Sequence, residues 1–202
     1  MKAIICKKYG GPEVLKLEEV AKPIPDYNEV CVKIHATAVT NSDIFIRGSK
    51  LPFPIIIPFR LMIGFFKPRK SIIGLVFSGE IESIGKNIKR FKPGDNVYGL
   101  TGFGLGTYAE FMCMKESDSK SGCIAIKPGN ISHEEATMAA YGGLLAFQYL
   151  EKGNIQKGTK GPYIWSFRGI WYISYTNCKA FGRRSYWCLQ YFKFGNGQKP
   201  GG

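Results

Sequence analysis

The composition of this 202-residue sequence changes after Lys160, and the change separates two stretches with unequal capacity to fold. Residues 161–202 contain no Asp or Glu, six Lys or Arg and all three tryptophans, whereas residues 1–160 hold all 15 acidic residues. A folded domain mixes both charge signs over its surface, so we interpret Lys160 as a boundary between sequences of different origin. The later stretch cannot form a doubly wound sheet, because one βαβ unit alone needs about 30 or more residues.

The net charge of +13 does not by itself indicate a partner. The first stretch carries 22 basic and 15 acidic residues, and the second carries six basic ones without any counter-charge. No nucleic-acid recognition motif accompanies these cations, so we do not expect nucleic-acid binding. The six cysteines include no C-x-x-C pair, and the N-terminus lacks a signal-peptide core. We therefore expect reduced thiols in a cytoplasmic protein.

Residues 1–130 alternate between short apolar or β-branched runs and turns rich in glycine and proline. In residues 29–36, for example, Val30, Val32 and Ile34 share one face of the expected strand. The expected strands are residues 2–6, 14–20, 29–36, 71–84, 96–99, 106–114 and 124–127. Their spacing predicts a mainly β, antiparallel and partly open barrel with glycine at its corners.

A helix is expected to follow the barrel within residues 131–160. Ser132 and Glu135 form a capping box, and Gly153 offers a C-terminal stop. The pair Gly142 and Gly143 costs this helix about 1 kcal/mol per glycine relative to alanine. Either the close approach of another backbone or ligand, or a break in the helix, explains the pair, and the sequence leaves both open.

Residues 51–66 are the most apolar part of the chain, with three prolines and Arg60 among them. The stretch is shorter than the roughly 20 residues that span a bilayer. We predict a hydrophobic lid or interface loop, and peripheral membrane contact stays open as an alternative.

Six segments in chain order carry a resemblance to a known family: residues 1–3 with 11–15, 29–34, 41–48, 79–85, 91–99 and 106–110. Together they resemble the N-terminal, GroES-like catalytic domain of medium-chain dehydrogenase/reductases, in the zinc-independent quinone-oxidoreductase-like branch. The resemblance implies NAD(P)H bound between this domain and a following Rossmann domain. It also implies hydride transfer to a carbonyl, quinone or enone, and an enzyme that is commonly homo-oligomeric.

The resemblance also bears on zinc. A catalytic zinc needs about three protein ligands. Zinc-containing members of the family supply a cysteine and a histidine in the segments that correspond to residues 39–43 and 77–80. Neither residue type occurs there in this sequence. We therefore predict a site without metal.

The same resemblance implies where the active site lies. It places residues 40–47 as a loop on the nicotinamide side of the cleft, with Thr40, Asn41 and Asp43 as the catalytic candidates. Phe45 falls where an aromatic residue contacts the cofactor ring. Hydrogen bonds from such residues would polarise the substrate oxygen in place of a metal.

Two further matches concern binding and bracing. Gly143 and Leu144 match a segment beside the cofactor and are the remaining cofactor-binding candidates, although Leu145 replaces the threonine of the family pattern. Asp43 and Arg47 match a D-x-x-x-R pattern. An ion pair that braces the loop is an equally good explanation of that pattern.

After residue 160 the family continues with V-L-I-x-G-A-S-G-G-x-G-T, a strand and glycine turn that cradle a pyrophosphate. This sequence reads G-P-Y-I-W-S-F-R-G-I-W-Y instead. Tryptophan has the single codon TGG, and removal of its first base always leaves a glycine codon. Trp165 and Trp171 would then become glycines of the expected turn. We hypothesise a one-base insertion near codon 160 or 161.

The sequence therefore predicts a GroES-like domain in residues 1–130, a connecting helix in residues 131–160 and a non-native, disordered tail in residues 161–202. Without a Rossmann domain the chain is expected to bind neither NADP(H) nor NAD(H) and to be inactive as written. A β-barrel interaction module and a basic membrane-peripheral protein are the alternative functions. The substrate, the NADH or NADPH preference and the oligomeric state are left open.

Overall fold

A computed structural model describes residues 1–48, 54, 56–118, 122–145, 148 and 152 of the chain. The predicted non-native tail, residues 161–202, lies outside the described residues, as do the predicted helix stop at Gly153 and residues 51–53 and 55. The chain divides into two compact units, Met1–Tyr141 and Gly142–Gly202. The first unit contains the β-sheets and the site residues from Thr40 to Phe45.

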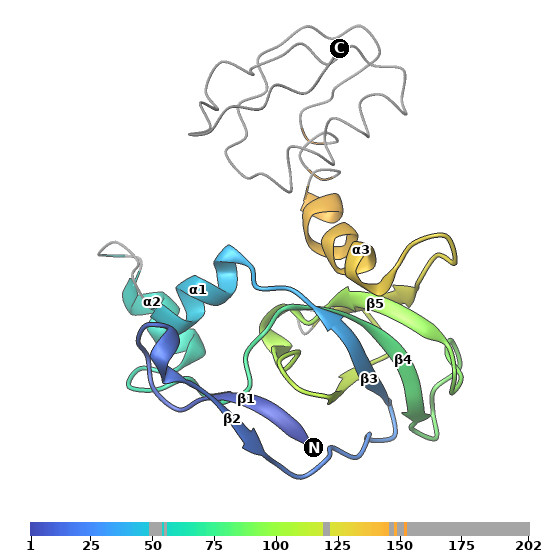
Figure 1. Ribbon diagram of the computed structural model, residues 1–202, viewed down its shortest axis with the longest axis horizontal. Coiled ribbons are helices and arrows are strands. Elements are labelled where there is room, and N and C mark those ends of the chain that lie inside the picture. Colours follow the sequence, from blue (N-terminus) through green and yellow to red (C-terminus); the bar gives the residue numbers. More distant parts are fainter. Residues whose placement is uncertain (49–53, 55, 119–121, 146–147, 149–151, 153–202) are drawn as a thin grey trace, which may run out of the picture. The chain divides into compact units, whose positions relative to one another are not determined.

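The first unit is built mainly from antiparallel strands that curl into an open half-barrel, as predicted (Figure 1). Five strands form one sheet in the order β6-β3-β4-β5-β7. Their bounds are β3 Glu29–Thr37, β4 Val76–Ile84, β5 Asn96–Leu100, β6 Phe111–Lys115 and β7 Cys123–Ile126. A second sheet pairs β1 Lys2–Cys6 with β2 Leu15–Glu19.

The sheet curls where β3 meets β4. The pairing shifts register between Cys31 and Val32 and again between Ile34 and Ala36, and such irregularities bend a strand and increase its twist. Gly79 lets the two strands approach here, because a Cβ at this position would lie 2.1 Å from the carbonyl oxygen of Lys33. The position therefore requires glycine.

Nine buried residues fill the inside of the barrel, and all of them are apolar. They come from β3 to β7 and from the turn before β5, and they include Val30, Val32, Phe77, Ile81 and Val97. The apolar positions of the alternating pattern that predicted these strands therefore lie on the inward face of the sheet.

Two helices lie where the sequence predicted loops. Helix α1, Asn41–Gly48, takes the place of the cofactor loop expected in residues 40–47. Helix α2 spans Ile56–Ile63 within the apolar stretch. Pro58 is tolerated there because it occupies the first turn, where a backbone N–H has no partner within the helix.

Helices α1 and α2 lie beside the β1–β2 sheet (Figure 1) and share a second core with it. Cys6, Val14, Ile46, Ile73 and Tyr108 are its buried members. Phe59 and Ile63 of α2 pack against this core. We call α1, α2 and this second core the α1–α2 region.

Some expected strands are shorter than predicted. The strand in residues 71–84 begins only at Val76, and the strand in residues 106–114 begins only at Phe111. The preceding residues instead form single bridges to β1, where Ala109 pairs with Ala3 and Ile72 pairs with Ile5. Two 3-10 turns, Pro12–Val14 and Gly102–Gly104, complete the connections.

Helix α3, His133–Met138, begins with the predicted capping box between Ser132 and Glu135. It continues into a π-helical segment, η3, Ala139–Gly143. The pair Gly142 and Gly143 therefore lies in a widened helical turn, a feature often found at functional sites. No helix among the described residues is both long and apolar enough to span a bilayer.

Candidate active site

The residue before helix α1 and the third residue within it hold the start of the helix together. The backbone N–H of Thr40 donates to Asp43 Oδ2 at 2.8 Å, and the Thr40 hydroxyl donates to the same oxygen at 2.6 Å. The backbone N–H of Asp43 in turn points at Thr40 Oγ1, 3.4 Å away. This reciprocal pattern is that of a capping box, with Asp in place of Glu. Thr40 and Asp43 therefore have a structural role at this helix end.

Asp43 is only 2% exposed, and its second oxygen faces a buried polar cluster. Burial raises the pKa of Asp43, while the hydrogen bonds from Thr40 and the nearby Tyr108 hydroxyl counteract that rise. Burial and the Asp43 carboxylate both raise the pKa of Tyr108. The Tyr108 hydroxyl acts on Asp43 by proximity alone, since Asp43 Oδ1, the Tyr108 hydroxyl and Arg47 Nε complete no hydrogen bond among the described residues.

The expected bracing ion pair between Asp43 and Arg47 is not formed. Within the described part of the chain, the ion pairs join Lys7 to Glu18, Lys22 to Glu82 and His35 to Glu80. Hydrogen bonds between Thr40 and Asp43 hold this segment instead. Asp43 lies at the helix N-terminus, where its carboxylate accepts from donors that have no partner within the helix.

Asn41 and Phe45 occupy the opposite, solvent-facing side of α1. They are one helical turn apart, so their side chains are neighbours on the helix surface. The Phe45 ring is 44% exposed, and Asn41 is also exposed. The four sequence-predicted residues of α1 thus separate into a buried pair, Thr40 with Asp43, and an accessible pair, Asn41 with Phe45.

A hydrogen bond that the sequence did not predict connects α1 with the helix after the barrel. Ser42 Oγ lies 3.0 Å from Tyr141 Oη. Tyr141 belongs to the π-helical segment, whose widened turn changes the direction in which this side chain points. Gly143 ends that segment and Leu144 follows it, and both belong to the second compact unit.

A second polar cluster fixes the start of α3 on the barrel. Ser78 Oγ lies 2.8 Å from His133 Nδ1, and the rings of His133 and His35 have centroids 4.8 Å apart. Burial, His35 and Lys127 lower the pKa of His133. Ser78 also donates to the carbonyl of Val97. The contacts of Ser78 and His133 therefore attach a helix to a sheet, a role that residue type alone could not indicate.

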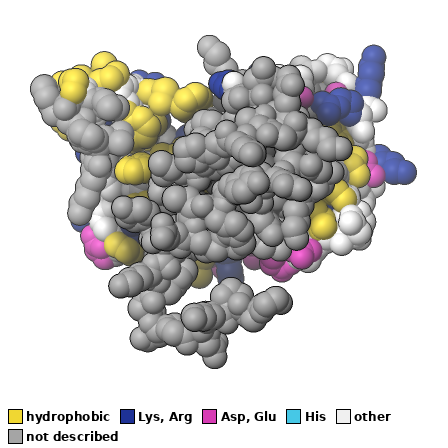
Figure 2. Space-filling model, turned by 90° about the horizontal axis from the view of Figure 1, so that it is seen from above, with side chains coloured by type: hydrophobic (Ala, Val, Ile, Leu, Met, Phe, Trp, Pro, Cys, Tyr) yellow, Lys and Arg dark blue, Asp and Glu magenta, His cyan; other side chains and the backbone are white. Residues whose placement is uncertain are grey.

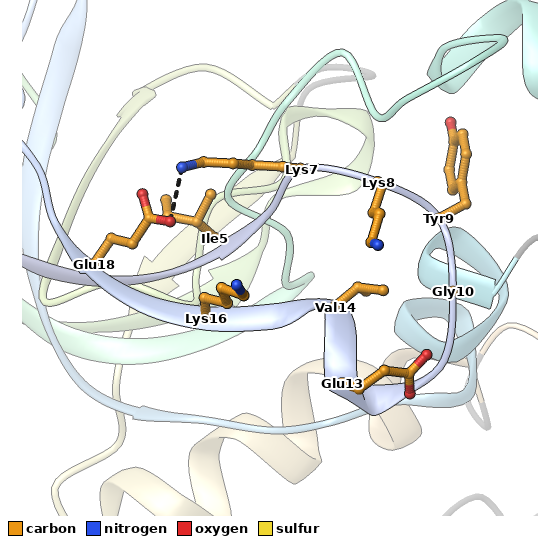
Figure 3. A pocket seen from close by; sticks show the side chains of 9 residues that line it. All are labelled: Ile5, Lys7, Lys8, Tyr9, Gly10, Glu13, Val14, Lys16 and Glu18. Atoms are coloured by element: carbon orange, nitrogen blue, oxygen red, sulfur yellow. Dashed lines mark ion pairs between the residues drawn. The ribbon is translucent and has the colours of Figure 1, made fainter.

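A cavity of about 560 Å³ opens beside the β1–β2 sheet, away from this cluster (Figure 3). Ile5 and Val14 form its apolar wall, and Lys8 and Lys16 bring positive charge to it. Lys7 is paired with Glu18 at 2.8 Å. Thr40, Asn41, Asp43 and Phe45 are not among its lining residues. Among the described residues, no three His, Cys, Asp or Glu side chains gather as metal ligands.

Comparison with known proteins gives this geometry its context. Residues 26–128 match the family model of the alcohol dehydrogenase GroES-like domain. Quinone oxidoreductase from Sus scrofa is 37% identical over 112 residues, which cover 55% of this chain and 30% of that protein. The mitochondrial NAD(P)H oxidoreductase RTN4IP1 from Danio rerio is 33% identical over 148 residues, covering 70% of this chain and 36% of that protein.

The fold has matching solved structures. Escherichia coli quinone oxidoreductase in complex with NADPH aligns with a TM-score of 0.69 and 25% identity, covering 91% of this chain and 51% of that one. The chain spans about a third of the length of the curated relatives it matches, with 30% and 36% of the two proteins covered. The expectation of a GroES-like, quinone-oxidoreductase-like domain is confirmed.

Proposed function

Because the chain belongs to the alcohol dehydrogenase GroES-like domain family, we propose that it is the catalytic-domain portion of a zinc-independent NAD(P)H-dependent oxidoreductase. The substrate class we propose is a quinone, enone or carbonyl compound reduced by hydride transfer. The accessible pair Asn41 and Phe45 on a braced helix is the observation that carries the proposal.

A nicotinamide nucleotide, when bound, supplies the hydride. The exposed Phe45 ring offers an apolar plane suited to packing against an aromatic heterocycle. The Asn41 amide can donate to a substrate oxygen on which negative charge develops. Thr40 and Asp43 keep that amide in place by fixing the helix end, so we assign them positioning rather than catalytic roles.

The described residues fit only one side of such a cofactor. A pyrophosphate needs backbone N–H groups of a glycine turn at a helix N-terminus. The sequence that follows Lys160 has Pro162 and two tryptophans where the family has that turn. We therefore propose that the protein as written binds no NADPH, and that Gly143 and Leu144 contribute to cofactor binding only when the frame continues correctly.

Resequencing of the gene and a titration test this proposal together. We expect one superfluous base near codon 160, and a protein translated without that base should bind NADPH with heat detectable by calorimetry. The 202-residue protein should give no heat under the same conditions. An uninterrupted frame through codon 165, or NADPH binding by the 202-residue protein, would refute the proposal.

The surface of α2 supports a second candidate function, contact with an anionic membrane surface. Hydrophobic side chains gather on the side of the molecule where α1 and α2 lie (Figure 2). Leu61, Phe65 and Phe66 are exposed there, and Lys67 and Arg69 are exposed beside them. Apolar rings flanked by cations suit an interface with acidic lipids.

Vesicle flotation tests this second function. The full chain should float with vesicles containing phosphatidylserine and lose that association when Phe66 is replaced by Ser. Phe103→Ser, which changes another exposed phenylalanine, is the control and should still float. Equal flotation of all three proteins would exclude Phe66, in the segment that follows α2, as the membrane contact.

A further inference from the structure

Cys31 on β3 and Cys113 on the edge strand β6 lie directly opposite each other. The ladder has hydrogen-bonded pairs on both sides of them. Ile34 N–H donates to Glu110 at 2.8 Å, and Glu116 N–H donates to Asn28 at 3.3 Å. Paired positions alternate between the hydrogen-bonded and the non-hydrogen-bonded type.

The two cysteines are three positions from each of these hydrogen-bonded pairs, and so they form a non-hydrogen-bonded pair. Side chains approach most closely at such a pair, with Cα atoms about 4.5 Å apart. Disulfides span Cα separations of about 4.4–6.8 Å. The backbone therefore already has a spacing that a bond between the two sulfur atoms can bridge.

Both thiols point to the outer face of the sheet. Their neighbours Val30, Val32, Met112 and Met114 belong to the barrel core, and successive side chains of a strand point to opposite faces. The two thiols therefore face the same side of the ladder at opposed positions, and their closeness lowers the pKa of Cys31 and raises that of Cys113.

Neighbouring side chains cover the Cys31 thiol, whereas the Cys113 side of the pair is partly open to solvent. Cys31 Sγ lies 3.6 Å from Glu82 Oε2 and is fully buried. Lys22 pairs with Glu82 on one side, and its Nζ lies 4.1 Å from the centre of the Phe111 ring on the other. Cys113 is half-buried on the edge strand, so a small oxidant has access from that side.

We propose that Cys31 and Cys113 are a redox-active thiol pair that closes to a disulfide between β3 and β6 when the protein meets a peroxide. Each thiol loses its hydrogen and one S–S bond forms. The two electrons and two protons released reduce one hydrogen peroxide to two waters. A small dithiol reverses the step by thiol–disulfide exchange.

Cys123 provides a matched control within the same sheet. It is also half-buried on an edge strand, β7, but the residue opposite it is Leu100. Within the described strands its thiol faces no cysteine in register, so the proposal assigns it no disulfide.

Peptide mapping of the full chain tests the proposal. The reduced protein is treated with hydrogen peroxide, quenched in acidic denaturant with N-ethylmaleimide, and digested without reductant for mass spectrometry. We expect a cross-linked peptide that contains Cys31 and Cys113, with the loss of two alkylated thiols and their recovery after dithiothreitol. Cys123→Ser should keep the cross-link, and Cys31→Ser or Cys113→Ser should abolish it.

The wild-type map decides the matter even where a variant does not fold. Full alkylation of both cysteines after peroxide would overturn the proposal. A Cys113 sulfinic or sulfonic acid without a cross-link, or a cross-link from Cys113 to any cysteine other than Cys31, would overturn it as well.

Discussion

The barrel and the α1–α2 region differ in the polar side chains that they bury. The barrel core is an apolar cluster, and Ser78, the buried polar residue of β4, is hydrogen-bonded to Val97 and His133. The α1–α2 region instead buries Thr40, Asp43 and Tyr108, and three of its buried polar atoms complete no ordinary hydrogen bond within the described residues. Buried polar groups of this kind reduce stability. The contrast supports the proposal that the α1–α2 region holds residues for function, while the barrel stabilises the domain.

The largest expected effect lies in the barrel. Phe77 is fully buried in its core, and Phe77→Ala should lower the free energy of unfolding by about 3–5 kcal/mol. Phe103→Ala, at an exposed phenylalanine, should change it by less than about 0.5 kcal/mol. Urea unfolding measures both. Equal effects of the two substitutions would contradict the claim that the barrel core stabilises the domain.

The next effect separates two replacements of Asp43. Asp43→Ala leaves the Thr40 N–H and hydroxyl without their acceptor, so unfolding should become easier by about 2–3 kcal/mol. Asp43→Asn retains an acceptor oxygen and removes a buried charge, and it should leave stability nearly unchanged. Thermal unfolding compares them. A large loss in Asp43→Asn would show that the carboxylate charge itself is needed for folding.

A smaller effect is expected at the connection between α1 and the π-helical segment. Ser42→Ala and Tyr141→Phe each remove the same hydrogen bond, so each should cost about 1 kcal/mol. The double variant should cost little more than either single one, because the two side chains share one interaction. Additive losses in this cycle would mean that the two side chains act independently.

The smallest effect is a pH dependence at the start of α3. The pKa of His133 is below its ordinary value of 6.5, chiefly through burial. The unfolded chain therefore binds a proton more readily than the folded one as the pH falls through that value. Stability should be full above pH 6.5 and should fall below it, by less than about 1 kcal/mol for this partly exposed ring.

His133→Asn tests this pH dependence, since it removes the titrating ring. As the pH falls from neutral to below 6.5, the thermal midpoint of the wild type should drop more steeply than that of His133→Asn. Parallel pH profiles of the two proteins would assign the dependence to a group other than His133.

The barrel was predictable because its pattern is local. The alternation at Val30, Val32 and Ile34 predicted β3, and the capping box at Ser132 predicted the start of α3. Helix α1 was not predicted, because the family resemblance placed residues 40–47 in a loop beside the cofactor. The prolines of residues 51–66 concealed α2, since Pro58 is compatible with a helix only in the first turn.

The site itself was only partly predictable. Asn41 and Phe45 lie on an exposed face, as cofactor-facing residues require. The contacts of Ser42 with Tyr141 and of Ser78 with His133 join residues that are 99 and 55 positions apart. Such pairs depend on the tertiary arrangement, and one sequence gives no signal for them. The capping box at Thr40 could have been recognised from the sequence, because an acidic residue, Asp43, follows three positions later.

The division between a stabilising buried pair and a functional exposed pair on α1 can be tested in one measurement. In a protein translated without the proposed extra base, Asn41→Ala should lower kcat/KM for NADPH-dependent quinone reduction by about 100-fold. Its thermal midpoint should equal that of the unmodified protein, and Ile44→Ala at a neighbouring exposed position should retain activity. An unchanged kcat/KM in Asn41→Ala, or a loss of activity that follows a loss of stability, would contradict the assignment.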